Sequence, residues 1–154
     1  LIIRYKNERL LFFISRIMEV GKLEIGAICG NFDVVHPGYI KLFEEMNKKC
    51  TNQYILLHDN PQIERPEKIK PILNTEERKG MLKYFFTQPT FLTYNTEAEL
   101  YFLLKSINPD IRFLGDDYIN KKYTGDDLGI LIHWINRSHG WSTTKFKKAI
   151  AKSI

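Results

Sequence analysis

The sequence predicts an α/β fold of three layers, with helices on both faces of a mainly parallel five-stranded sheet. Short apolar runs alternate along the chain with segments of helical periodicity, an order typical of strand–helix–strand units with parallel strands. Polar stretches that contain proline or glycine separate these segments. At 154 residues, the chain is long enough for one domain with its own hydrophobic core.

Each predicted element has a local signal in the sequence. Five apolar runs with polar boundaries are predicted strands: Glu24–Gly30, Gln53–His58, Thr90–Tyr94, Ile111–Gly115 and Gly129–Trp134. Four segments with helical spacing are predicted helices: Gly38–Lys49, Thr75–Phe86, Glu97–Ile107 and Thr143–Ala151. Pro37 suits the first position of a helix, and Asn74 or Thr75 can cap the second one. The proline-containing stretch 59–71 and the stretch 121–127 are predicted loops.

The segment 30–39, Gly-Asn-Phe-Asp-Val-Val-His-Pro-Gly-Tyr, joins the first strand to the first helix. A helix N-terminus presents unpaired N–H groups and a partial positive charge, so it can bind phosphate. Gly38 has no Cβ, and we expect phosphate to approach the backbone there. His36 and Tyr39 are three residues apart and share a helix face. Asp33 is expected to shape the turn through bonds to its backbone.

Three polar segments are predicted to meet at one edge of the sheet. In an open α/β sheet, ligands bind beyond the carboxyl ends of the strands, where the strand order reverses. Segment 31–39 follows the first strand, Asp116 and Asp117 follow the fourth, and segment 137–144 follows the fifth. We therefore expect a nucleoside triphosphate to bind between the first and fourth strands.

Two motifs resemble those of cytidylyltransferase-like nucleotidyltransferases. Segment 30–39 is similar to that family's G-x-F-D-x-x-H-x-G-H signature, and segment 137–145, Arg-Ser-His-Gly-Trp-Ser-Thr-Thr-Lys, is similar to its R-T-x-G-I-S-T-T-K block. The motifs occur in the family's order, and the resemblance extends from Glu24 to the C-terminus. It is greatest to the glycerol-3-phosphate cytidylyltransferase type and implies a Rossmann-like fold.

The resemblance implies roles for individual residues. Catalytic roles in stabilising the charge on the transferred phosphate fall to His36, Lys70 and Lys145. Nucleotide binding is implied for Asn31, Phe32, His36, Gly38, Tyr39, Asp116, Asp117, Arg137, Ser142, Thr143 and Thr144. Acceptor binding is implied for Lys68, Lys70 and Arg78. No protein-bound metal is expected, because Mg²⁺ would arrive with the nucleotide. For several of these residues a structural role is the alternative: helix capping for residues 142–144, a solvated surface for Arg137 and the two loop lysines, and turn capping for Asp116 and Asp117.

The sequence departs from the family pattern at two places that bear on activity. Tyr39 replaces the second histidine of the first motif, and a tyrosine carries no positive charge near neutral pH. The family's R-Y-V-D stretch is replaced by residues 86–89, Phe-Thr-Gln-Pro, which lack its arginine and aspartate. Asn31 and Ser138 are smaller departures. The fold prediction survives these changes, whereas the predicted activity depends on them.

The amino-acid composition narrows the cellular compartment and the kinds of binding partner that we expect for this protein. Lys and Arg total 23 against 18 Asp and Glu, a net charge of +5 without a long basic run, so we expect an anionic small molecule and no nucleic acid. Two cysteines without metal-binding spacing favour a reducing, cytoplasmic location. No apolar run is long enough to span a membrane. Residues 1–17 are expected to be an N-terminal extension of doubtful status, residues 18–154 the single nucleotidyltransferase domain, and a homodimer is left open.

Three functions are compatible with these observations. The leading one is transfer of CMP from CTP to a small phosphorylated alcohol such as glycerol 3-phosphate, with release of pyrophosphate. The second is an ATP-dependent adenylyltransferase of the same fold. The third is a nucleotide-binding protein that has lost turnover, which Tyr39 and Phe86 would explain.

Overall fold

The structure is a computed structural model that describes residues 7–12, 14–15, 18 and 21–154. Its sheet has five strands in the order β3-β2-β1-β4-β5, and all neighbouring strands are parallel. The strands are β1 (Leu23–Gly30), β2 (Cys50–His58), β3 (Pro89–Tyr94), β4 (Ile111–Gly115) and β5 (Leu131–Ile135). The predicted Rossmann-like parallel sheet is confirmed.

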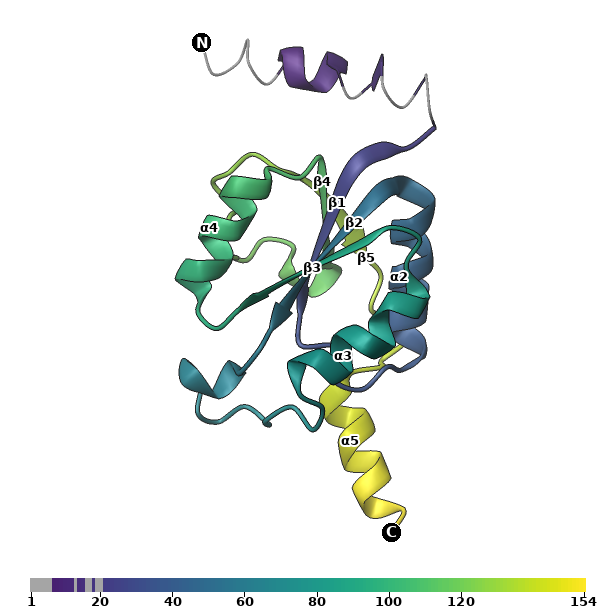
Figure 1. Cartoon of the computed structure of the whole chain (residues 1–154), viewed down its shortest axis with the longest axis vertical. Helices are drawn as coiled ribbons and strands as arrows, with labels where there is room; N and C mark the ends of the chain where they lie inside the picture. The colour runs from purple at the N-terminus through teal and green to yellow at the C-terminus, as the bar shows by residue number, and fades with distance from the viewer. Residues whose placement is uncertain (1–6, 13, 16–17, 19–20) are drawn as a thin grey trace.

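Helices cover both faces of the sheet. They are α2 (Pro37–Lys49), α3 (Thr75–Leu82), α4 (Glu97–Ile107) and α5 (Thr143–Lys152). Figure 1 shows α4 on one side of the sheet, α2 and α3 on the other, and α5 beyond its lower end. The chain runs from β1 through β2 to β3, then returns to β4 on the other side of β1. The strand order therefore reverses between β1 and β4, where the sequence predicts the ligand site.

Three predicted boundaries are wrong by two residues or more. β2 begins at Cys50 rather than Gln53, because α2 passes directly into an extended Cys50 that pairs with Leu23. Gly129 has a φ of +67°, so β5 begins at Leu131 instead.

The second helix ends at Leu82 and not at Phe86. The three residues Lys83–Phe85 form a short 3₁₀ helix, and the Asn47 side chain donates a hydrogen bond of 2.7 Å to the Phe85 carbonyl. The Gln53 side chain then accepts the N–H of Gln88 at 2.8 Å, which turns the chain into β3. Tertiary contacts thus end a helix that periodicity alone extends.

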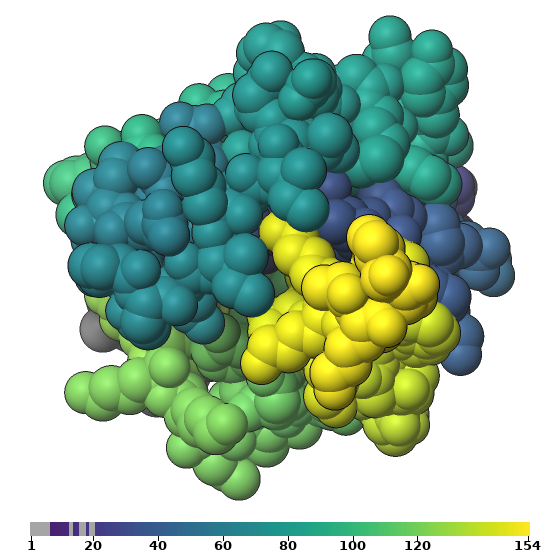
Figure 2. All heavy atoms as spheres, turned by 90° about the horizontal axis from the view of Figure 1, so that it is seen from below, coloured from purple at the N-terminus to yellow at the C-terminus, as the bar shows by residue number. Residues whose placement is uncertain are grey.

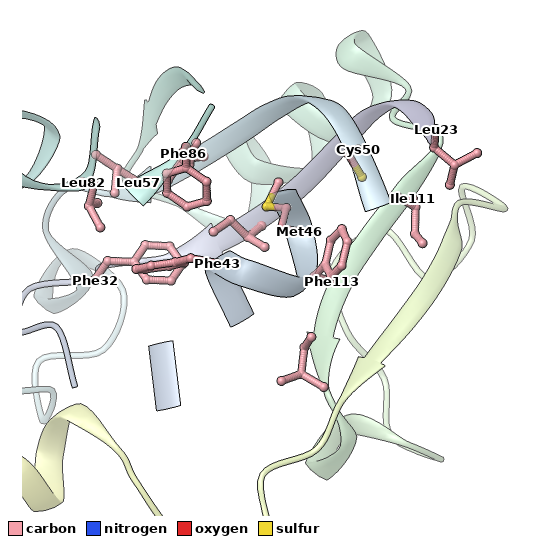
Figure 3. Packing of buried hydrophobic residues seen from close by; sticks show 13 residues of the cluster. Leu23, Phe32, Phe43, Met46, Cys50, Leu57, Leu82, Phe86, Ile111 and Phe113 are labelled. Carbon is pink, nitrogen blue, oxygen red and sulfur yellow. The ribbon is translucent and has the colours of Figure 1, made fainter. Parts of the chain in front are cut away.

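Phe86, which stands where the resemblance implies an arginine, belongs to the core between the sheet and α2. Its ring centre lies 4.8 Å from that of Phe43, which is itself buried. Figure 3 shows these rings with Phe32 and Met46 in one cluster. Phe86 is therefore a packing residue in this chain.

Residues 7–12 and 14–15 contain helical turns, which Figure 1 shows apart from the three layers. The Arg9 guanidinium donates to the Asn108 side chain at 2.9 Å. Part of the expected extension 1–17 lies outside the described residues, so its status stays a prediction. Among the residues described, no helix combines the length and apolar character that crossing a membrane requires.

Candidate active site

A cavity of about 850 Å³ opens at the carboxyl ends of β1 and β4. Its lining includes Asn31, Phe32, His36, Gly38, Tyr39, Lys68, Arg137, Ser142, Thr143 and Thr144. Figure 2 looks onto this end of the molecule, where α5 lies between the loop after β2 and the loop after β4. The structure thus brings ten of the sequence-predicted residues to one cavity.

His36 is the N-cap residue of α2, directly before Pro37 at the first helical position. Its ring stacks on that of Tyr39 with 4.0 Å between the centres, and the Trp141 ring lies nearly parallel to it at 6.1 Å. Only 5% of His36 is exposed, and neither ring nitrogen has a hydrogen-bond partner among the described residues. Buried polar groups are normally paired, so this imidazole is available for a ligand.

Burial lowers the pKa of His36, and the positive charge of Arg137 acts in the same direction. The imidazole is therefore neutral near neutral pH. A neutral imidazole offers one N–H donor and one acceptor. It can donate a hydrogen bond to a phosphate oxygen without first being protonated.

Tyr39 joins the two motifs. Its hydroxyl lies 2.9 Å from the Thr143 hydroxyl, so the first turn of α2 is hydrogen-bonded to the first turn of α5. Burial raises the pKa of Tyr39, which keeps the phenol neutral. The N-termini of the two helices therefore lie at the same cavity, which Gly38, Tyr39, Ser142 and Thr143 line.

Gly38 makes room for the second motif rather than for open phosphate access. A Cβ on Gly38 would lie 2.5 Å from Cε1 of His139 and 3.1 Å from Cβ of Trp141. His139 in turn accepts the N–H of Trp141 at 2.9 Å, which fixes this loop. The expectation that a phosphate fills the space above Gly38 is corrected: residues of the second motif occupy it.

Asp33 ties three segments together. It is fully buried, and its carboxylate accepts the N–H groups of Ile72 and Leu73, each at 2.8 Å, and forms an ion pair with Lys147 of α5. Burial alone would raise the pKa of Asp33, but the bonds from Lys147 and from the two N–H groups lower it overall. Asp33 thus makes the expected side-chain to backbone bonds, but with residues 72 and 73 and not within its own turn, where the Asn31 side chain accepts the Asp33 N–H at 3.4 Å.

The model of a protein family described as "Cytidylyltransferase-like" matches residues 27–150 of this chain, which include both motifs. The chain belongs to this cytidylyltransferase-like family. The resemblance deduced from the two motifs is thereby confirmed.

Similar proteins agree with this assignment. The bifunctional protein HldE of Hyphomonas neptunium is 27% identical over 107 residues, which are 69% of this chain and 22% of that protein. An FAD synthase of Methanohalophilus mahii is 32% identical over 90 residues, 58% of this chain and 61% of that protein. This cytidylyltransferase-like chain therefore spans less than two thirds of the length of either relative.

A solved structure supports the fold. The lipopolysaccharide core biosynthesis protein of Thermoplasma volcanium GSS1 has a TM-score of 0.54 and 20% identity. The similarity covers 74% of this chain and 95% of that one.

Arg78, predicted to bind the acceptor, is a structural residue in this cytidylyltransferase-like chain. It is 1% exposed, and its guanidinium donates to the carbonyl oxygens of Asn31, His58 and Asp59 at 2.9, 2.8 and 3.0 Å. It is not among the described residues that line the cavity. Arg78 therefore holds together the segments that follow β1 and β2, and it positions Asn31.

Four further predicted residues are not among the described residues that line the cavity: Lys70, Asp116, Asp117 and Lys145. Lys70 is exposed, and exposed Lys145 donates to the Gly140 carbonyl at 3.4 Å. Asp116 accepts the backbone N–H of Arg137 at 3.3 Å, and Asp117 pairs with the Arg137 guanidinium at 3.6 Å. The two aspartates thus orient Arg137, which does line the cavity. Ser142 lies where both of its expected roles, nucleotide binding and helix capping, would place it. It lines the cavity, and its side chain caps α5 by accepting the Lys145 N–H at 3.2 Å.

Four cationic cavity residues were missed in the sequence: Arg65, Arg112, Lys122 and Lys147. Lys147 follows Thr143 by four residues, so helical spacing alone puts both on one face of α5. Arg112 interrupts the apolar run of β4, and a charge inside a buried strand is itself a signal. Arg65 lies in a polar loop and has no such signal.

Proposed function

We propose that this chain is a nucleotidyltransferase, which binds a nucleoside triphosphate in the cavity and transfers its nucleotidyl group to a phosphorylated small molecule. The main support is His36: a buried imidazole without a partner in the described structure, at a helix N-terminus hydrogen-bonded through Tyr39 to a second helix N-terminus. Family membership supports the same chemistry. Free cysteines at positions 29 and 50 are compatible with the cytoplasm as the place of this reaction.

In this reaction an oxygen of the acceptor phosphate attacks the α-phosphorus of the nucleotide. The new O–P bond forms as the bond to pyrophosphate breaks, and the displaced electron pair leaves with pyrophosphate. Neutral His36 donates a hydrogen bond to a phosphate oxygen, while Arg137 adds a fixed positive charge. Such groups accelerate the reaction by positioning two anions and by stabilising charge in the transition state.

Mg²⁺ would enter with the nucleotide. Within the described part of the chain, no group of three or more His, Cys, Asp or Glu side chains could hold a metal ion. Mg²⁺ bound through substrate phosphates needs few protein ligands. A cavity without a group of metal-binding side chains among the described residues is therefore compatible with an ion carried by the triphosphate. The ion would neutralise phosphate charge there.

CTP with a phosphorylated alcohol such as glycerol 3-phosphate is our first candidate pair, because the motifs most resemble that type. ATP is the second nucleotide candidate, favoured by the similarity to an FAD synthase. Loss of turnover is the third reading, and the replacement of a histidine by Tyr39 is the observation behind it.

A substrate panel separates the three readings. CTP and ATP would each be offered with glycerol 3-phosphate, sugar phosphates and FMN, with pyrophosphate release and nucleotide affinity measured in parallel. We expect acceptor-dependent pyrophosphate release with one nucleotide. Saturable nucleotide binding without release from any pair would replace the transferase with the binding protein, and absence of binding would refute both.

A further inference from the structure

The cavity continues beyond the helix N-termini to the α4 side of the sheet. We call this part the Arg112 lobe, and it is lined by Cys29, Tyr94, Glu97, Arg112, Tyr123 and Thr124. Cys29 and Tyr94 belong to the hydrophobic cluster under α4, whereas Phe32 and Tyr39 belong to the cluster under α2. The lobe therefore lies on the opposite face of the sheet from the His36–Tyr39–Thr143 group.

Arg112 is a buried cation with an unused donor. It is 4% exposed, and one terminal N–H group donates to the Thr124 carbonyl, but Nε has no partner among the described residues. Its guanidinium faces the Tyr123 ring at 5.5 Å, and no described carboxylate forms a salt bridge with it. Burying a cation without an anionic partner is costly, so this arrangement points to an oxygen-bearing ligand.

The lobe also contains a hydrogen-bond acceptor. The Glu97 carboxylate accepts the Thr124 hydroxyl and lies 3.5 Å from the Arg65 guanidinium, whose buried Nε is likewise without a partner among the described residues. Donors and an acceptor thus line the same space. A hydroxyl group, which both donates and accepts, matches this set better than a phosphate alone does.

The rings of the lobe leave little room for a stacked base. Tyr94 stacks on His58 at 4.6 Å between ring centres. Tyr123 is covered by the Arg112 guanidinium and meets Trp134 edge-on at 6.2 Å. A nucleobase is commonly bound against a free aromatic face, whereas this lobe offers polar groups, so its chemistry favours the acceptor.

We propose that the Arg112 lobe binds the hydroxyl-bearing end of the acceptor, which is a phosphorylated polyol or sugar, and that Arg112 selects it. This inference rests on the proposed transferase function. The reacting phosphate of the acceptor then lies toward His36, and the rest of the molecule extends under α4 toward Arg112 and Glu97. Methyl phosphate, which has the phosphate without the hydroxyls, is the matched poor acceptor.

Cys29 provides a probe of the lobe in the native protein. Cys29 is a partly exposed residue that lines the lobe, whereas Cys50 is fully buried and lies outside the described lining. Burial raises the pKa of both thiols, and Asp110 helps to raise the pKa of Cys50 to about 12. Methyl methanethiosulfonate should therefore modify Cys29 first, and mass spectrometry of peptides locates the adduct. Cys29→Ser is the control that removes this signal.

The labelling experiment compares the acceptor with the nucleotide. With CTP or ATP held constant, glycerol 3-phosphate or a hexose 1-phosphate should slow Cys29 modification, whereas either nucleotide alone and methyl phosphate should leave its rate unchanged. Equal protection by methyl phosphate, protection by nucleotide alone, or no protection by any hydroxylated phosphate overturns the proposal.

Kinetics test Arg112 itself. Arg112→Gln should raise the KM for the hydroxylated acceptor by about tenfold to a hundredfold, the loss expected for one charged hydrogen bond, and leave the KM for the nucleotide within about twofold. Lys105→Gln removes the same charge from the exposed surface of α4 and should change neither. Thermal unfolding checks that Arg112→Gln folds; if it does not, Thr124→Val, which removes the hydroxyl bonded to Glu97, takes its place.

The two proposals fail differently. If the parent protein releases no pyrophosphate with any pair, the transferase function fails. If the parent is active but Arg112→Gln raises the KM for the nucleotide and not for the acceptor, only the acceptor lobe is refuted.

Discussion

Replacement of Tyr39 by phenylalanine tests the contact between the two motifs. The change removes only the hydroxyl that lies 2.9 Å from the Thr143 hydroxyl, and it keeps the ring that stacks on His36. A neutral hydrogen bond contributes about 0.5–1.5 kcal/mol, so the free energy of unfolding should fall by about 1 kcal/mol. If the same bond holds α5 in place during catalysis, kcat should fall by about two- to tenfold.

The assay is pyrophosphate release at saturating substrates, with urea unfolding measured in parallel. Tyr84→Phe is the matched control, because Tyr84 is 80% exposed and lies outside the cavity. Tyr39→His restores the family pattern and should retain or raise kcat. A loss of about a hundredfold or more in Tyr39→Phe would mean that the hydroxyl contacts the transferred phosphate directly. Unchanged stability and unchanged kcat would refute the coupling of α2 to α5 through this bond.

Three further predictions concern His36 and the Asp33–Lys147 pair. His36→Ala should lower kcat by about a hundredfold or more while nucleotide affinity changes much less, and equal losses in both would make His36 a uniform binding residue. Lys147→Met should lower the free energy of unfolding by about 3–5 kcal/mol in urea unfolding, because it leaves the buried Asp33 carboxylate without its cation. Lys147→Met combined with Asp33→Asn should cost less than Lys147→Met alone, and an equal or larger cost would contradict the pairing. Burial lowers the folded-state pKa of His36, so the unfolded chain binds the proton more readily, and stability should fall as pH drops below the ordinary histidine value of about 6.5. His36→Asn should make this loss of stability less steep, and the loss that remains would come from His58, whose pKa burial also lowers. An unchanged pH dependence of stability in His36→Asn would contradict the prediction.

The sheet and its ligand-binding edge follow from sequence patterns because they depend on local order. Alternating apolar runs and helices define parallel strands, and the polar segments after β1 and β5 then meet at one edge. The end of the second helix was missed because it depends on distant side chains. Asn47 and Gln53, both far from Phe86 in sequence, end the second helix early.

The position of the site could be predicted where a motif fixes it, whereas contacts with partners from distant loops were missed. His36, Tyr39 and Thr143 follow from two helix N-termini that face one another. No local pattern reveals that Asp33 binds N–H groups some forty residues away, or that Arg78 donates to carbonyls that follow two different strands. Arg78 and Lys145 have the charge expected of phosphate ligands, but burial against carbonyl oxygens in one case and exposure in the other place them outside the described lining of the cavity.

Transfer of label from the nucleotide tests the central claim most directly. CTP and ATP labelled at the α-phosphate would be incubated with Mg²⁺ and the panel of phosphorylated acceptors, and the products separated by chromatography. The account predicts that label appears in a nucleotidyl–acceptor conjugate with an equal amount of unlabelled pyrophosphate, and that His36→Ala abolishes the conjugate. Saturable binding of the nucleotides with no labelled conjugate from any pair would contradict it.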